Sequence, residues 1–128
     1  MHNRELGNWG EEQASEFLRK EGYEIIERNF FSYQGEIDII AKDKNELVFC
    51  EVKTRRNVNF GMPADSVNFY KKKHIYATAK YYLYKNNLNK VFVRFDIIEV
   101  YLINHKIKIN HLKNVMWLYF KKKKCIMF

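Results

Sequence analysis

Three charged residues lie within two neighbouring apolar segments, and their types suggest chemistry. Residues 35–53 read GEIDIIAKDKNELVFCEVK, with Asp38 in the first apolar run and Glu51 and Lys53 at the end of the second. A carboxylate inside an apolar strand is costly to bury unless another group pairs with it. Side chains alternate between the faces of a strand, so Glu51 and Lys53 share one face. We therefore expect Asp38, Glu51 and Lys53 to converge across neighbouring strands.

This convergence has two interpretations, one catalytic and one structural. Two adjacent carboxylates repel each other, and a hard divalent cation such as Mg²⁺ relieves that repulsion while keeping positions for water and phosphate oxygens. A lysine on the same face could orient or deprotonate an attacking water, or neutralise a developing charge. These groups suit metal-assisted hydrolysis of a phosphodiester. The alternative is a structural Asp, Glu and Lys network on a half-exposed sheet face, because perturbed charge clusters are often structural.

The elements that position these residues follow from the hydrophobic pattern. The polar residues Asp43, Lys44 and Asn45 separate the apolar runs 37–41 and 47–52, which predicts a β-hairpin. Apolar stripes predict helices over 9–21 and 65–84, and apolar runs predict strands over 23–30, 91–103 and 106–109. The order helix, three strands, helix, two strands predicts an α/β sandwich with a central mixed sheet.

Glu11 is a further candidate for the site. It is in phase with Ala14 and Leu18 on the inner side of the first predicted helix, whereas Glu12 is expected to face solvent. Glu11 could be a third site carboxylate, or an ordinary acidic partner of the helix dipole near the N-terminus. Gly10, beside it, could allow close approach of the helix backbone.

Longer stretches of the sequence resemble known families. Asp38 followed after a hairpin by Glu51, Val52 and Lys53 is similar to the Asp…Glu-x-Lys signature of the PD-(D/E)xK nucleases. The strings GEIDII, LVFCEVKTR and RFD, with the Gly-Glu pair at 10–11, resemble the UPF0102 family over roughly residues 7–101. The resemblance implies a restriction-endonuclease-like three-layer sandwich, with helices flanking a central mixed β-sheet. It implies endonuclease activity by analogy.

The same resemblance suggests roles for individual residues. Asp38 and Glu51 would bind Mg²⁺ or Mn²⁺, together with the backbone carbonyl of Val52. Lys53 would position the attacking water. Glu11 would act through a second metal ion or a bridging water, which makes Glu11, Asp38, Glu51 and Lys53 the predicted catalytic residues.

Basic residues next to this site are candidates for contact with nucleic acid. Arg55 and Arg56 directly follow the signature lysine, and guanidinium groups match phosphates in geometry. Solvated loop charges are the alternative. Lys71 precedes Ile75 by four residues, at the start of the inner stripe of the second predicted helix, so it is the lysine of that helix expected to face the site. The family also has a lysine at this place.

Length and composition restrict the function further. The 128 residues suit one domain, which we place at 1–112, with a basic and aromatic extension or frayed tail at 113–128. The net charge of +8 favours a polyanionic partner such as DNA or RNA, although abundant Lys, Asn, Ile, Tyr and Phe also suggest compositional drift in an AT-rich genome. No apolar run is long enough to span a membrane, and we expect a cytoplasmic protein.

Cysteine and histidine usage argues against other kinds of site. Cys50 and Cys125 form neither a disulfide framework nor a zinc motif, and the four histidines are scattered. No small-molecule cofactor is expected, and the oligomeric state does not follow from the sequence. The preferred function is a metal-dependent nuclease, with structure-selective endonuclease activity favoured. The alternatives are a catalytically inactive nucleic-acid-binding module and an interaction protein whose charge cluster is structural.

Overall fold

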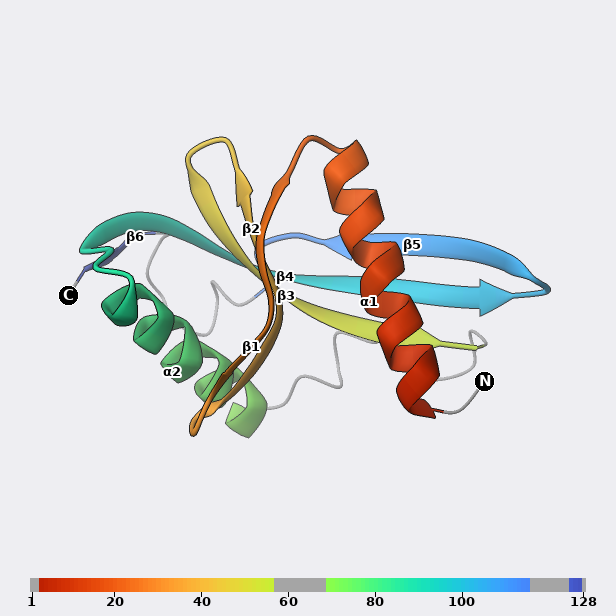
Figure 1. Cartoon of the computed structure of the whole chain (residues 1–128), viewed down its shortest axis with the longest axis horizontal. Coiled ribbons are helices and arrows are strands. Elements are labelled where there is room, and N and C mark those ends of the chain that lie inside the picture. Colours follow the sequence, from red (N-terminus) through yellow and green to blue (C-terminus); the bar gives the residue numbers. More distant parts are fainter. Residues whose placement is uncertain (1–2, 57–68, 116–124, 128) are drawn as a thin grey trace.

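The computed structural model describes residues 3–56, 69–115 and 125–127, and it contains both helices and strands (Figure 1). In chain order the elements are α1 (Asn3–Lys20), β1 (Glu24–Ser32), β2 (Gly35–Asp43), β3 (Glu46–Arg55), α2 (Phe69–Lys85), β4 (Lys90–Ile103), β5 (Lys106–Leu112) and β6 (Cys125–Met127). This order matches the predicted one, with β6 added at the C-terminal end.

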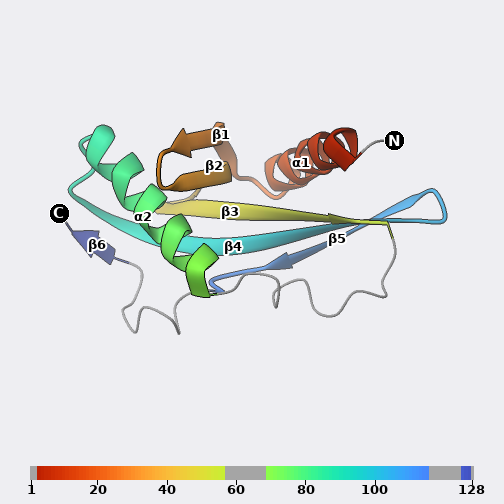
Figure 2. The same ribbon diagram turned by 90° about the horizontal axis from the view of Figure 1, so that it is seen from below.

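The strands form one mixed sheet. Its order is β1-β2-β3-β4-β5, and β6 pairs with the first residues of β4. Only β3 and β4 run parallel among the described strands, and α2 lies between them in the chain, as a parallel connection requires. The β1–β2 hairpin lies between the two helices in both views (Figures 1 and 2). Gly35, at the start of β2, lies next to Thr78 and His74 of α2.

Each helix covers one face of the sheet. Alternate residues of β3 divide between two hydrophobic clusters: Phe49 packs in the cluster that includes Ile75 and Leu83 of α2, and Cys50 in the cluster that includes Leu18 of α1. Because neighbouring residues of a strand point to opposite faces, the helices lie on opposite sides. This confirms the predicted three-layer α/β sandwich with a central mixed sheet.

The first helix begins six residues earlier than predicted, at Asn3 instead of residue 9. Gly7 and Gly10 make the first part of α1 a weak helix former in sequence. Close packing compensates at Gly10, which lies so near β3 that a methyl group on it would collide with Thr54 Oγ1. Gly7 is not packed in this way, since nothing lies within 4 Å of the position that its methyl group would occupy. Gly10 therefore allows the close approach that the sequence suggested, and Leu6 extends the buried stripe.

Residues with positive φ end the helices and form the turns. Gly22 has φ of 92° after α1, and Asn87 has φ of 56° after α2. In both places the next residue donates its N–H to the carbonyl five residues back, which closes the helix C-terminus. Asn104 and His105 form the hairpin turn between β4 and β5.

The second helix is described from Phe69, so the first four residues of the predicted helix, 65–68, lie outside the described part, as does most of the predicted tail. The predicted inner stripe of α2 is confirmed, since Ile75, Ala79, Tyr82 and Leu83 are all buried. Neither described helix is long and apolar enough to cross a membrane.

Candidate functional site

Asp38 lies where β2 and β3 separate. The ladder between these strands runs from Asp43 opposite Glu46 to Ile39 opposite Cys50, and no register pair is formed beyond that point between their described residues. Beyond that point the Asp38 carboxylate replaces a strand partner, because its Oδ2 accepts the N–H of Val52 at 2.8 Å. The side chain is thus held at the fork between two strands by one backbone hydrogen bond.

The environment of Asp38 disfavours its charge. Burial is the largest cause, and repulsion from Glu51 adds to it, so the pKa of Asp38 rises to about 8 despite the hydrogen bond from Val52. Glu51, on β3, has a side chain that is 12% exposed. Two acidic groups on neighbouring strands therefore share a poorly solvated region, as the sequence predicted.

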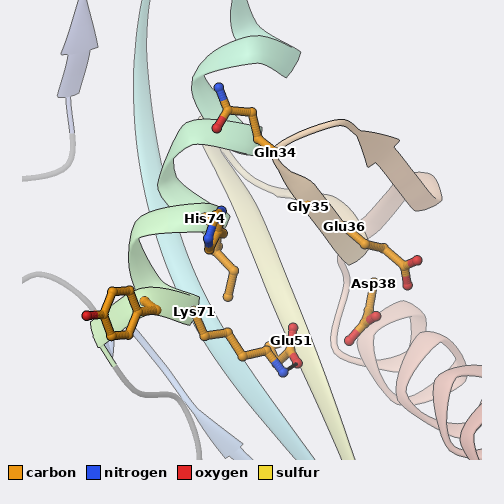
Figure 3. Close-up of a pocket in the computed structure, with 9 residues that line it drawn as sticks. Gln34, Gly35, Glu36, Asp38, Glu51, Lys71 and His74 are labelled. Carbon is orange, nitrogen blue, oxygen red and sulfur yellow. Dashed lines mark ion pairs between the residues drawn. The ribbon is translucent and has the colours of Figure 1, made fainter.

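Two lysines contact Glu51 from different elements. Lys53 Nζ lies 3.3 Å from Glu51 Oε1. Lys71 Nζ, which reaches over from α2, lies 2.6 Å from the same oxygen (Figure 3). Burial and the neighbouring Lys71 lower the pKa of Lys53. Burial is the largest effect on Lys71 and acts against its charge, but the interactions of Lys71 with Glu51, Lys53 and Asp38 together outweigh burial and raise the pKa of Lys71. The predicted inward face of Lys71 is confirmed.

Two cavities meet at the paired acids. The α2 cavity, of about 570 Å³, lies between α2 and the β1–β2 turn, and it is lined among others by Gln34, Asp38, Glu51, Tyr70, Lys71 and His74 (Figure 3). The α1 cavity, of about 420 Å³, lies between α1 and the end of β3, and it is lined among others by Glu11, Asp38, Glu51, Val52, Lys53 and Arg55. Asp38 and Glu51 are the only described residues that line both.

The remaining predicted residues lie around the α1 cavity, with one exception. Glu11 lines it, and burial raises the pKa of Glu11, with Arg28 opposing and Glu51 adding to the shift. Arg55 lines it too, and its Nε is buried without a hydrogen-bond partner in the described structure. Arg56 is exposed and is not among the described residues that line either cavity. The structure gathers Glu11, Asp38, Glu51, Lys53 and Arg55 in one place.

Known proteins of similar sequence identify the family. The profile of "Uncharacterised protein family UPF0102" matches residues 10–100. A UPF0102 protein of Clostridioides difficile is 49% identical over 114 residues, which cover 89% of this chain and 98% of the relative. The chain belongs to the UPF0102 family. A UPF0102 protein of Caldicellulosiruptor saccharolyticus is 47% identical over 116 residues, with 89% and 98% covered.

A comparison of structures adds little to this. The solved chain described as "Crystal structure of SSO0001" aligns with 85% of the UPF0102 chain and 50% of its own length, at 17% identity and a TM-score of 0.33. A likeness that low supports no argument about the site.

The acids of this UPF0102 chain suit a magnesium ion better than a zinc ion. Within the described ranges, no three Asp, Glu, His or Cys side chains gather closely enough to enclose a metal ion. Mg²⁺, however, is commonly held by one or two carboxylates and keeps several waters. Asp38 is half-buried, and its pKa is raised by desolvation and by a second carboxylate, so a divalent cation would stabilise its charge. Asp38 and Glu51 therefore fit Mg²⁺ in donor type.

Sequence reasoning missed most of a buried network on the α1 side of the sheet. Arg94 Nε lies 3.0 Å from Asp96 Oδ1, two residues along β4. His111 Nε2 lies 2.7 Å from the other oxygen of Asp96. Arg94 also binds Tyr23, Asp43 and Glu46. These partners are far apart in the sequence, and only the RFD string at 94–96 gave any signal.

Sequence reasoning also missed part of the α2 cavity. Gln34, Tyr70 and His74 line it beside the acids, yet none was a predicted site residue. The turn and the helix that carry them are separated by more than thirty positions in the printed sequence. No local pattern indicates that these two elements meet.

Proposed function

We propose that this chain is a metal-dependent nuclease that hydrolyses phosphodiester bonds in DNA or RNA, acting as a structure-selective endonuclease. The observation that supports this most is the pair Asp38 and Glu51, which lines both cavities beside Lys53. In this pair the charge of Asp38 is disfavoured by burial and by Glu51, and open space lies on two sides. That combination suits binding of a cation together with a phosphate.

The metal-binding role would fall to oxygen atoms at the fork of β2 and β3. Asp38 and Glu51 would hold Mg²⁺ or Mn²⁺, with the Val52 carbonyl and Glu11 as further ligands. When bound, such an ion lowers the pKa of water and neutralises charge on the phosphate. The Val52 N–H keeps Asp38 oriented through the hydrogen bond at 2.8 Å.

Lys53 is the group best placed to handle the proton of the attacking water. Its ammonium lies beside Glu51, and burial lowers its pKa, so it gives up a proton more readily than a solvated lysine. A group tuned in this way can orient water and exchange a proton with it. Arg55, on the same cavity, would supply a guanidinium for a neighbouring phosphate. Lys71, on the α2 cavity, and the exposed Arg56, outside both cavities, would add positive charge farther along the nucleic acid.

One observation favours a second function, a nucleic-acid-binding module without cleavage. Glu51 already has two ammonium groups within 3.3 Å, and the nearer one, on Lys71, is at 2.6 Å. A carboxylate neutralised by two lysines needs a metal ion less. Under this alternative the protein would bind nucleic acid through its basic surface, and Mg²⁺ would change nothing.

One experiment separates the two functions. Purified protein is incubated with duplex, junction, flap and single-stranded DNA and RNA in Mg²⁺, Mn²⁺ or EDTA. We expect cleavage that requires the metal ion and that falls at least about hundredfold in Asp38→Asn and Lys53→Met. Glu12→Gln is the matched control, because Glu12 neighbours Glu11 but pairs with Arg28 at the surface. Full activity in a clean Asp38→Asn preparation would refute the assignment.

A further inference from the structure

We propose that the α2 cavity holds one unstacked nucleobase, next to a backbone phosphate at Asp38 and Glu51. The inference rests on the proposed nuclease function, because that function places the phosphodiester at these two acids. Asp38 and Glu51 line both cavities, so a nucleotide chain that passes them has one neighbouring group on each side. The two cavities differ in their lining residues, and this difference indicates which cavity takes the base and which takes the sugar-phosphate backbone.

The α1 cavity suits the sugar-phosphate backbone. It presents the cationic side chains of Lys53 and Arg55 and the hydroxyl of Thr54. Charged and hydroxyl groups of this kind bind phosphate oxygens. They offer no flat apolar surface on which a base could stack.

The α2 cavity suits a base. Tyr70, in the first turn of α2, is 72% exposed, so its aromatic surface is accessible at the edge of the cavity. His74 lies one helical turn later and also lines the cavity, as do the apolar Ile75 and the amide of Gln34. Aromatic faces stack on bases, and imidazole and amide groups reach their edges. At about 570 Å³ the cavity is in the range of small-molecule sites.

The walls of the α2 cavity are fixed to each other. A methyl group on Gly35, in the β1–β2 turn, would lie 3.2 Å from Thr78 Oγ1 of α2, so the turn and the helix are closely packed. Ser32 Oγ donates to the same hydroxyl at 3.4 Å, and Thr78 donates to the His74 carbonyl at 2.8 Å. The cavity is therefore formed before any ligand binds, which reduces the cost of binding.

The proposal identifies a class of substrate. A base in a regular duplex is paired and stacked, and removing it from the duplex costs a few kcal/mol. The cost is lower for a base in a single strand, a flap or a mismatch. We therefore expect preferential binding of nucleic acid that has at least one unpaired base beside the reacting phosphate.

Binding in EDTA tests the inference apart from catalysis. The probe is a fluorescein-labelled single-stranded DNA with one 2-aminopurine, titrated with wild type, Tyr70→Ala, Tyr70→Phe and Tyr84→Ala. Tyr84 is the matched control, since it is on the same helix and 70% exposed but is not among the described lining residues. We expect about tenfold weaker binding for Tyr70→Ala and less than twofold change for Tyr70→Phe and Tyr84→Ala.

A second measurement locates the base. An abasic site is moved along the strand, and we expect one position where it weakens wild-type binding about tenfold but leaves Tyr70→Ala unaffected. Equal binding by Tyr70→Ala and Tyr84→Ala, no such position, or no binding at all would overturn the inference. Metal-dependent cleavage together with binding that does not depend on Tyr70 would support the proposed nuclease and reject the base-binding role of the α2 cavity. Tyr70-dependent binding without cleavage would support the cavity and reject the nuclease.

Discussion

Replacing Asp38 by asparagine should stabilise the metal-free protein at pH 8 while removing its activity. Asparagine keeps an oxygen that can accept the Val52 N–H, which now bonds to Asp38 Oδ2 at 2.8 Å. It removes the charge that burial and Glu51 disfavour. The same substitution would destabilise the protein if Asp38 were a well-paired structural carboxylate. The sign of the change therefore tests how we interpret the site.

The magnitude follows from the pKa of Asp38. The folded state holds this proton up to a pKa of about 8, against 3.8 for an ordinary aspartate. Folding therefore takes up a proton between about pH 4 and pH 8, and wild-type stability falls as the pH rises through that window. A shift of roughly four units sets an upper limit of about 5–6 kcal/mol, at about 1.4 kcal/mol per unit. Relaxation around Lys53 and Lys71 reduces this, and we expect about 2–4 kcal/mol at pH 8.

Urea denaturation of both proteins in EDTA, at several values between pH 4 and pH 8.5, measures the effect. The difference in the free energy of unfolding between Asp38→Asn and wild type should be near zero at pH 4 and largest near pH 8, with equal m-values. Mg²⁺ at about one hundred times its Kd should raise the free energy of unfolding of wild type by about 2.7 kcal/mol, and that of Asp38→Asn by much less. Glu12→Gln, at the surface, should stay within about 0.5 kcal/mol of wild type throughout.

One result would refute this reasoning. If Asp38→Asn were less stable than wild type at pH 8 in EDTA, the carboxylate would be charged and well compensated by the lysines around Glu51. The cluster would then be structural.

Three further predictions concern other parts of the chain. Gly10→Ala should lower the free energy of unfolding by about 2–3 kcal/mol, because its methyl group meets Thr54, whereas Gly7→Ala has open space and should cost nothing; equal effects in urea titrations would contradict the packing of α1 on β3. Asp96→Asn should cost about 3–5 kcal/mol, because it leaves the buried Arg94 without its main counter-charge, and a loss under 1 kcal/mol would disprove that role. Lys53→Met should reduce kcat but keep nucleic-acid affinity within about threefold, since the other cationic groups remain; an unchanged kcat would exclude Lys53 from proton transfer.

Local sequence patterns were sufficient for the order of the helices and strands from α1 to β5 and for part of the site. Glu51 and Cys50 lie on opposite faces of β3 because strict alternation holds there. The phase of α2 correctly placed Lys71 toward Glu51, because the apolar stripe fixes which side of the helix faces the sheet. Each of these predictions needs only one element and its buried face.

Alternation failed at the position that matters most. Ile37 packs in the cluster on the α2 side, although strict alternation would put it with Ile39, which packs on the α1 side. The ladder to β3 ends at Ile39, so the strand on the other side of Asp38 is free to turn. The end of a ladder is a long-range property, and no pattern within residues 35–43 reveals it. The partners of Arg94 and the α2 cavity were missed for the same reason.

Asp38 and Asp96 show what separates a site from a scaffold in this sheet. Asp96 is 2% exposed, and burial acts to raise its pKa, but His111, Arg94 and the N–H of Asn114 outweigh this, so the pKa of Asp96 is lowered. Asp38 has one N–H and a repelling acid, so its pKa is raised. Two aspartates of one sheet therefore differ in what surrounds them: the buried Asp96 is compensated from within the chain, and the half-buried Asp38 is left with a deficit of positive charge beside open cavities. The substitutions Asp96→Asn and Asp38→Asn should accordingly change stability at pH 8 in opposite directions, and a shared sign would remove the distinction on which the proposed metal site depends.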